Sequence, residues 1–206
     1  MEESRAMTSS VPFAAALTCH PETFSQAVRG IKVRVSWAEG EVLAVTYTLW
    51  GDITRVAIPP PGPPRRADYL WRHTCFEAFV AVKSKPEYYE FNFAPSREWA
   101  AYSFRRYRVG ALLEDGELVP KIGARRAGDS FALDAVIRLH RLPMIPQNVR
   151  LELGLSAVIE EENGVFSYWA LRHPPGKPDF HHRDAFALDI ERPDVEILNE
   201  GQMEKR

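Results

Sequence analysis

The stretch Val149–Ile159, which reads VRLELGLSAVI, places an apolar side chain at every odd position. A β-strand turns successive side chains to opposite faces of a sheet, so a period of two indicates a strand with one buried face. The stretch Phe131–Leu139, which reads FALDAVIRL, repeats the pattern, again with apolar residues at the odd positions. Both segments therefore predict strands whose odd-numbered side chains are buried.

Further strand-like runs occur along the whole chain, separated by turn residues. They are Ile31–Trp37, Val42–Trp50, Ile53–Ile58, Cys75–Val82, Tyr88–Phe93, Phe166–Leu171 and Ala185–Ile190. Only Trp99–Arg108 and Phe24–Arg29 have a helical pattern, and both are short. About eight to eleven short antiparallel strands without interleaved helices predict an all-β fold, either a sandwich or a barrel.

The composition is that of an ordinary globular protein. The chain has 206 residues, of which 45% are hydrophobic and 11% aromatic, and its formal net charge is −2 with a pI near 6.3. This charge gives no general attraction to nucleic acid or to anionic membranes, so we expect neither as a partner. No apolar run approaches the ~20 residues of a membrane-spanning helix. The acidic N-terminus also lacks the basic region of a signal peptide.

The charged, patternless ends of the chain indicate the domain boundaries. We interpret residues 1–10 and 193–206 as disordered tails around a single domain, residues 11–192. The run Pro59–Pro64 predicts an extended surface loop, since proline cannot pair inside a sheet. Cys19 and Cys75 make no disulfide framework, and a reduced, cytoplasmic protein is expected. The sequence indicates no oligomeric state.

Two of the predicted strands can be paired as a hairpin. In Cys75–Val82 the even positions are apolar, and in Tyr88–Phe93 the odd positions are apolar. If both apolar sets face one core, Val82 lies opposite Tyr89, and a slip by one residue would turn every side chain to the wrong face. The other, outer face then carries a mostly polar set: Glu77, Phe79, Glu90 and Asn92.

This register predicts distances on the outer face. Phe79 lies opposite Asn92, so Glu77 becomes a diagonal neighbour of Asn92 at ~7–8 Å. Glu77 and Glu90 are about four residues apart along the strands, or ~13 Å. The paired carboxylates of glycosidases lie ~5–9.5 Å apart, so we do not expect these two glutamates to form a catalytic pair.

A proline-rich segment, Tyr168–Arg183, concentrates rings and hydrogen-bonding groups. It reads YWALRHPPGKPDFHHR and holds three of the six histidines of the chain. Its prolines exclude a helix or a central strand, and stiff loops on rigid scaffolds are common places for ligand sites. We expect Trp169–His182 to cross the mouth of the sandwich and to meet the segment Trp71–Glu77.

Four sequence blocks stand out in this order: LWRHTCFEAF at 70–79, YEFNFAPS at 89–96, WAAY at 99–102, and WALRHP at 169–174 with PDFH at 178–181. Together they resemble the DOMON-like proteins, which are related to the family 9 carbohydrate-binding modules, over residues 17–191. The resemblance implies an immunoglobulin-like β-sandwich with a pocket on one face, for haem or for a sugar. In family 9 modules tryptophans clamp a terminal sugar, while carboxylate, amide and arginine side chains bind its hydroxyl groups.

The resemblance also implies particular site residues. Trp71, Glu77 and Trp169 fall in the matching blocks, and Asn92 and Arg108 have the appropriate chemistry. A flat ring covers the apolar face of a sugar, and Glu, Asn and Arg side chains match its hydroxyl groups. The alternative is structural: both tryptophans pack in the core or against loops, and Glu77 forms an ion pair with an arginine.

Zinc is a second interpretation of the loop, since His173, Asp179, His181 and His182 supply nitrogen and oxygen ligands. However, adjacent histidines in an extended segment point to opposite sides, so only one of the last two can face a shared site. Haem would require an axial methionine, and only Met144 lies within the expected domain. We expect neither cofactor, although the sequence leaves both open.

The leading hypothesis is a non-catalytic protein that binds a small polar ligand, such as a saccharide or a sugar-like metabolite. The candidate ligand-binding residues are Trp71, Glu77, Asn92, Arg108, Trp169, His173, Asp179 and His181. Two alternatives remain: a structural or interaction protein without a small ligand, and an enzyme or metal site built on the His173–His182 loop.

Overall fold

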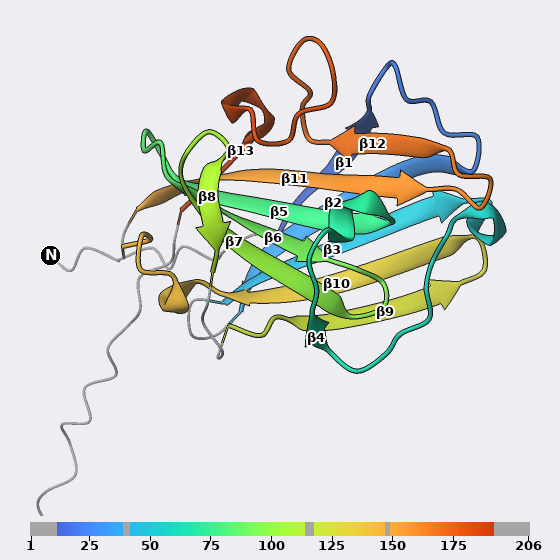
Figure 1. The fold of residues 1–206 in the computed structure, drawn as a ribbon, viewed down its shortest axis with the longest axis horizontal. Helices are drawn as coiled ribbons and strands as arrows, with labels where there is room; N and C mark the ends of the chain where they lie inside the picture. Colours follow the sequence, from blue (N-terminus) through green and yellow to red (C-terminus); the bar gives the residue numbers. More distant parts are fainter. Residues whose placement is uncertain (1–11, 39–41, 114–117, 147–148, 192–206) are drawn as a thin grey trace, which may run out of the picture.

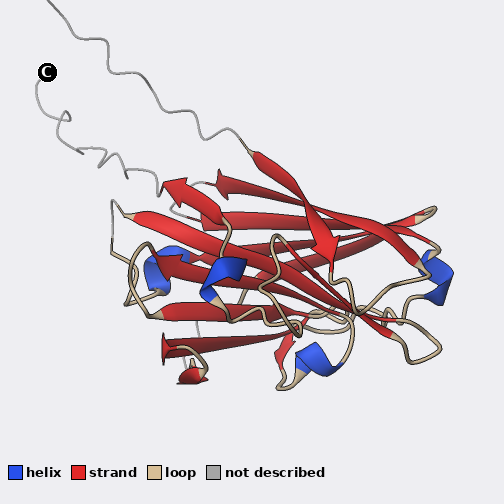
Figure 2. Cartoon of the chain, turned by 90° about the horizontal axis from the view of Figure 1, so that it is seen from above, coloured by secondary structure: helices blue, strands red, loops and turns tan. Residues whose placement is uncertain are grey.

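The structure, a computed structural model, describes residues 12–38, 42–113, 118–146 and 149–191. Nearly all the regular structure is strand, and the helices are single turns that are too short to cross a membrane (Figure 2). The strands are β1 (Phe13–Cys19), β2 (Val28–Ala38), β3 (Val42–Gly51), β4 (Arg65–Arg66), β5 (Cys75–Val82), β6 (Tyr88–Phe93), β7 (Glu98–Arg106), β8 (Val109–Leu112), β9 (Lys121–Ala127), β10 (Ser130–Arg138), β11 (Arg150–Glu160), β12 (Phe166–Ala170) and β13 (Leu188–Glu191). The 3₁₀ turns are η1 (Ile53–Arg55), η2 (Leu70–Arg72), η3 (Leu139–Arg141) and η4 (Arg183–Ala185).

The strands join into one curled sheet in the order β4-β7-β6-β5-β11-β12-β1-β2-β3-β10-β9, with β13 paired to β11 and β8 to β7 (Figure 1). Strand β1 connects two halves, because Phe13–Leu17 pair with β2 whereas Thr18 and Cys19 pair with β12. We call β2, β3, β9 and β10 the β3 half, and the strands from β4 to β8 with β11, β12 and β13 the β5 half. The prediction of an all-β fold is confirmed, with more strands than the eight to eleven expected.

The main core lies between the two halves. The ring of Phe76 on β5 contacts Tyr47 on β3 at 5.2 Å and Phe131 on β10 at 6.1 Å between centroids. The Tyr47 hydroxyl also donates a 2.7 Å hydrogen bond to the carbonyl oxygen of Glu77. The odd positions of β11, from Leu151 to Ile159, are buried in the same core, as their alternation predicts. Each such side chain contributes roughly 1.5–3 kcal/mol by burial, which holds the halves together.

Some expected elements differ from those observed. The segment Trp99–Arg108, expected to be helical, belongs largely to strand β7, and Phe24–Arg29 is a loop that runs into β2. Ile53–Ile58, expected to be a strand, forms η1 followed by a single bridge at Val56. Tertiary pairing decides these cases: β7 lies beside β6, and this neighbour outweighs the local helical pattern of its sequence.

Strands β1, β4, β8 and β9 were absent from the expected set, and the expected strand at Ala185–Ile190 begins only at Leu188. Strand β9 ends the sheet, and most of its side chains are exposed, so it lacks the apolar alternation that would reveal it. The expected tails, residues 1–10 and 193–206, lie outside the described residues.

The predicted hairpin register is wrong by two residues. Strands β5 and β6 pair Glu77 with Asn92 and Phe79 with Glu90, whereas Phe79 was expected opposite Asn92. A slip of two residues keeps every side chain on its expected face, so alternation alone cannot detect it. The observed pairing ends at Ala81 and Tyr88, one residue before the end of β5. The length of the turn that joins these two residues therefore sets the register.

The observed register places the side chains of the two glutamates closer together than the predicted one. Glu77 and Glu90 are diagonal neighbours across β5 and β6, at ~7–8 Å between backbones instead of ~13 Å. The distance argument against a carboxylate pair therefore fails in the structure.

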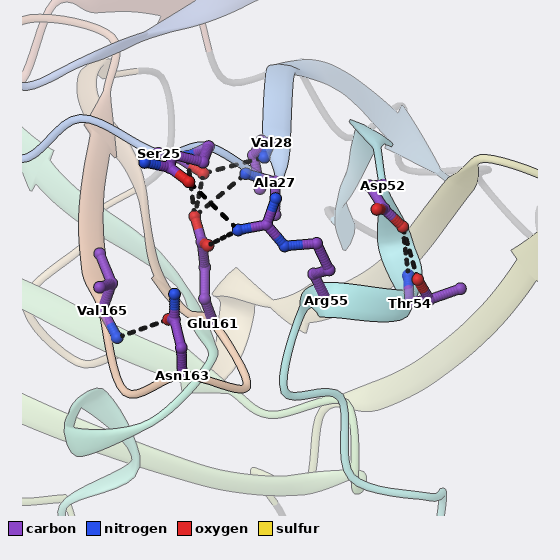
Figure 3. Close-up of polar contacts among 10 residues, drawn as sticks. Ser25, Ala27, Val28, Asp52, Thr54, Arg55, Glu161, Asn163 and Val165 are labelled. Atoms are coloured by element: carbon purple, nitrogen blue, oxygen red, sulfur yellow. Dashed lines mark hydrogen bonds and ion pairs between the residues drawn. The ribbon is translucent and has the colours of Figure 1, made fainter.

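A buried carboxylate fastens the loop that precedes β2 to the hairpin of β11 and β12 (Figure 3). Glu161, only 2% exposed, accepts hydrogen bonds from the Ser25 hydroxyl at 2.8 Å and from the backbone N–H groups of Gln26 and Ala27 at 2.9 and 3.1 Å. Its second oxygen lies 3.3 Å from the guanidinium of Arg55. These bonds connect three segments that are distant in the sequence.

Candidate functional site

A cavity of about 450 Å³ lies on the outer face of the β5 half, the face turned away from the main core. Its floor consists of side chains from β5, β6, β7, β11 and β12, and its walls come from η2, from the β7–β8 turn and from the loop after β12. We call this cavity the pocket. It is lined by Tyr69, Trp71, Glu77, Glu90, Tyr102, Phe104, Arg108, Val158, Tyr168, Pro178, Phe180 and His181.

Two buried glutamates form the polar part of the floor. Glu77 on β5 is 3% exposed and Glu90 on β6 is 5% exposed. The Glu90 carboxyl accepts a 2.7 Å hydrogen bond from the side-chain amide of Asn92. Within the described residues, no protein group hydrogen-bonds the Glu77 carboxyl. The hydroxyl of Ser156, directly opposite Glu77 on β11, is buried and also has no partner.

The environment favours the protonated form of both carboxyl groups. Burial raises the pKa of Glu77 well above its usual value, and the neighbouring charge of Glu90 raises it further, whereas Arg108 acts in the opposite direction. Burial also raises the pKa of Glu90 to about 7, despite the hydrogen bond from Asn92 and the nearby charge of Arg108. A carboxyl group in this state donates as well as accepts hydrogen bonds.

His181 completes the polar surface as a neutral imidazole. The backbone N–H of Arg108 donates to the Tyr88 hydroxyl at 3.1 Å, and this hydroxyl shares a 2.9 Å hydrogen bond with Nδ1 of His181. The other ring nitrogen, Nε2, lies 3.6 Å from a carboxyl oxygen of Glu90. Burial and the charge of Arg108 lower the pKa of His181 to about 4, although Asp179 opposes them.

Arg108 is held in place by two neighbours. It adopts a left-handed conformation, with φ of 54°, in the turn between β7 and β8. Its guanidinium contacts Asp179 at 2.8 Å and the Tyr107 hydroxyl at 3.3 Å, and this hydroxyl donates to Asp179 at 2.6 Å. Burial would raise the pKa of Asp179, but the hydrogen bonds from Tyr107 and Arg108 lower it below its usual value. Asp179 thus stays ionised and balances the charge of Arg108.

Exposed rings form one rim of the pocket. Tyr69 is 57% exposed and Trp71 is 45% exposed, and their centroids lie 6.3 Å apart at a steep angle. The guanidinium of Arg72 lies over both rings, at 4.6 and 5.4 Å from their centroids. Tyr69 has a left-handed φ of 61°, which is uncommon for a residue with a large side chain. The rim therefore offers flat apolar surface beside the polar floor.

Four of the predicted site residues line the pocket: Trp71, Glu77, Arg108 and His181. Asn92 and Asp179 lie behind them, where Asn92 binds Glu90 and Asp179 binds Arg108. The proline-rich loop and the Trp71–Glu77 segment line the same pocket, which lies on the outer face of the β5 half and not at the mouth between the two halves.

The structure does not bring Trp169 or His173 to the pocket. Trp169 is 6% exposed and packs in the main core, with its Nε1–H donating to the Ser167 hydroxyl at 2.9 Å. On β12 the alternation turns Tyr168 toward the pocket and Trp169 away from it. His173 lies 2.8 Å from the carbonyl oxygen of Thr18, so it fastens the loop to β1.

Several lining residues were not predicted. Glu90 shares its face with Asn92, a pattern that the sequence shows, but the wrong register placed it far from Glu77. Five aromatic residues also line the pocket, although nothing in the sequence assigned them to a ligand site: Tyr69, Tyr102, Phe104, Tyr168 and Phe180. Rings at these positions are common in any apolar core, and only the fold shows that they surround a cavity.

Among the described residues, no three His, Cys, Asp or Glu side chains are grouped so that they could hold a metal ion. His181 faces the pocket, whereas His182 accepts a hydrogen bond from the backbone N–H of Asp184 and begins η4. Of the two histidines, only His181 therefore lines the pocket. Met144, the residue considered for haem, packs against the main core.

The fold and the site define an all-β protein with a pocket on one face of its sheet. Aromatic rings form the rim of this pocket, and two carboxyl groups lie on its floor. No family model and no curated protein matches the chain. Its fold is similar to that of a proposed carbohydrate-binding protein from Bacteroides uniformis ATCC 8492, with a TM-score of 0.58 and 13% identity over 84% of this chain and 82% of that one.

A family 9 carbohydrate-binding module from Caldicellulosiruptor kristjanssonii is more distantly similar. Its complex with cellotriose gives a TM-score of 0.44 and 10% identity, over 74% of this chain and 69% of that one. Its complex with glucose gives 0.46 and 11%, over 85% and 82%. The structural neighbours therefore bind carbohydrate or are proposed to do so, and the similarity to the Bacteroides protein extends to the fold alone.

Proposed function

We propose that this protein binds a small polyhydroxylated ligand, a saccharide or a sugar-like metabolite, in the pocket. The proposal rests on the Glu77 side chain. This residue is buried, its carboxyl group lines the cavity, and that group has no hydrogen-bond partner among the described residues. Its oxygens are not among the fully enclosed, unpartnered side-chain atoms of the described residues, so they are open to the cavity and available to a ligand. A ligand hydroxyl in the pocket would give this carboxyl group a partner.

The remaining chemistry matches a neutral sugar. Sugar hydroxyls both donate and accept hydrogen bonds, and so do the protonated carboxyl groups of Glu77 and Glu90. Rings such as Trp71 supply the flat surface that the apolar face of a sugar covers. The fold shared with a proposed carbohydrate-binding protein agrees with this ligand class.

We propose binding without chemistry, although the two glutamates are neighbours. A retaining glycosidase requires one carboxylate that is ionised and one that is protonated, which means environments that push the two pKa values apart. Here burial raises the pKa of both groups. Near neutral pH neither carboxyl group is therefore held as a fixed carboxylate, the state that a nucleophile requires.

Three finer assignments belong to the same proposal. They are an immunoglobulin-like arrangement of the sandwich, membership of the DOMON-like group, and a cytoplasmic location. Two halves facing one core support the first, and a pocket on one sheet face supports the second. The free thiols of Cys19 and Cys75 support the third.

The proposal is tested by titrating a panel of mono- and oligosaccharides into the wild type and two variants, followed by calorimetry. Glu77→Gln keeps the size of the side chain but removes its acid proton, and Trp71→Ala removes a half-exposed ring at the rim. We expect each to weaken binding of the best sugar by about 10-fold or more, in line with 1–3 kcal/mol per lost contact.

Phe24→Ala is the matched control, because Phe24 is 76% exposed and does not line the pocket. It should leave the affinity unchanged. A panel without a single binder, or a bound sugar that is insensitive to Glu77→Gln, would contradict the proposed site.

A further inference from the structure

A second cavity, of about 750 Å³, adjoins the pocket at His181, which lines both. Its walls come from the β5–β6 turn, from the end of β7 and from the loop that contains η4. The cationic and titratable side chains that line it are Lys85, Arg106, His181, His182 and Arg183. We call this cavity the basic groove. No Asp or Glu is among its lining residues in the described part of the chain.

Two of the cations have no counter-charge. Lys85 and Arg106 are exposed, and neither has an ion-pair partner among the described residues. Arg183 is already engaged, since its guanidinium binds the carboxylate of Glu152 and lies 3.3 Å from the carbonyl oxygen of Val82. The groove therefore presents unbalanced positive charge from two segments that are distant in the sequence.

Glu87, in the same turn as Lys85, forms no ion pair with either cation among the described residues, and two further acidic groups already have partners. Asp179 is committed to Arg108 and Tyr107 in the wall of the pocket, and Asp184 lies 3.7 Å from His182. Cations that converge on one cavity repel one another, and a bound anion relieves that repulsion and accepts their hydrogen bonds.

A thin wall of rings separates the groove from the pocket. Phe104 lines the pocket and Tyr88 lines the groove, and the two rings are stacked, with centroids 4.7 Å apart and planes within 5°. His181 contacts both rings and is accessible from both cavities. The two cavities therefore meet at His181, and a ligand that reaches this side chain from the pocket lies beside the groove.

We propose that the basic groove binds an anionic group, a phosphate or a carboxylate, through Lys85 and Arg106. It follows that the ligand of the pocket is a phosphorylated or acidic saccharide. The anion site is argued from the groove alone, whereas the ligand class rests on the proposed function.

The anion site is tested with inorganic phosphate. Thermal unfolding is compared in sodium phosphate and in sodium chloride of equal ionic strength, for the wild type and for the double variant K85Q/R106Q. At a phosphate concentration of about ten times Kd, we expect the melting temperature of the wild type to rise by ~3 °C. The double variant should show no rise.

The double variant K121Q/R126Q is the matched control, because it removes two exposed cations from β9 in the β3 half. It should respond to phosphate like the wild type. Equal stabilisation of K85Q/R106Q and the wild type by phosphate would overturn the anion site, and so would a wild type that phosphate does not stabilise.

The ligand class is tested by calorimetry with glucose, glucose 6-phosphate and glucuronate. We expect at least one of the two anionic sugars to bind about 10-fold more tightly than glucose, and K85Q/R106Q to remove that advantage. The better of the two identifies the anionic group. Equal affinities for all three would overturn the ligand class and leave the proposed function standing. Phosphate binding without any sugar binding would overturn the proposed function and leave the anion site standing.

Discussion

At the scale of single residues, the floor of the pocket consists of two acids whose pKa values are raised by burial. Glu77 and Glu90 are neighbours on the floor, each almost excluded from water. Two adjacent carboxylates would repel each other, so the pair favours retention of a proton. The neutral imidazole of His181 adds a further N–H donor without adding charge. The chemistry of the floor therefore suits hydroxyl groups better than ions, as the proposed ligand requires.

The raised pKa of Glu90 predicts a dependence of stability on pH. Because its folded value of about 7 exceeds the ordinary value of 4.5, the folded protein binds this proton more tightly than the unfolded chain does. The contribution of Glu90 to the free energy of unfolding is thus greatest below pH 4.5 and is lost as the pH rises to about 7. We expect a loss of at most about 3 kcal/mol across this window.

Glu90→Gln should reduce this dependence, since an amide does not titrate and its oxygen still accepts the hydrogen bond from Asn92, and the part that remains comes from Glu77, whose pKa burial also raises. Urea denaturation at a series of pH values between 4.5 and 7.5 measures the effect. Glu162→Gln, at an exposed carboxylate, is the control and should keep the wild-type slope. A wild-type slope in Glu90→Gln would show that Glu90 is ionised throughout.

At the scale of elements, the Glu161 network fastens a loop to the β11–β12 hairpin. We expect Glu161→Gln to lower the free energy of unfolding by about 1–3 kcal/mol, because an amide supplies one acceptor oxygen for donors that now share two. Arg55→Gln should cost less than about 1 kcal/mol, because Arg55 is 42% exposed. Denaturant titrations of both variants compare the two values, and equal losses would contradict the ranking.

The same network predicts acid sensitivity. Burial alone would raise the pKa of Glu161, but hydrogen bonds from Ala27, Ser25 and Gln26 and the charge of Arg55 lower it below 4.5. Its stabilisation is therefore complete above pH 4.5 and is lost as the pH falls through the folded value. This direction is opposite to that of Glu90. Glu161→Gln should therefore change the free energy of unfolding at acidic pH, whereas Glu90→Gln should change how it falls between pH 4.5 and about 7.

At the scale of the whole molecule, Trp169 belongs to the packing between the two halves of the sheet. Trp169→Ala should lower the free energy of unfolding by ~3–5 kcal/mol, the usual range for an emptied buried aromatic site. It should leave saccharide affinity nearly unchanged, provided that the variant is measured below its melting temperature. Trp71→Ala should show the reverse. If Trp169→Ala abolished saccharide binding with little loss of stability, this prediction would be wrong and Trp169 would belong to the ligand site.

The sequence predicts which side chains share a face, because alternation is local and its period is a property of the strand. The faces of β5, β6, β10 and β11 follow from their residues alone, and Glu77, Glu90 and Asn92 are placed together on the outer one. The blocks that contain Trp71 and His181, and the chemistry of Arg108, also indicate residues that prove to line one pocket. Each of these predictions needs only neighbours along the chain.

Tertiary structure decides what depends on contacts between distant segments. The β5–β6 turn sets a register two residues from the expected one, and this difference makes Glu77 and Glu90 neighbours. Pairing with β11 and β1 positions β12 so that Trp169 enters the core and Tyr168 enters the pocket. The burial that raises the pKa of Glu90 comes from side chains that the fold brings together from distant parts of the chain, and no local pattern encodes it.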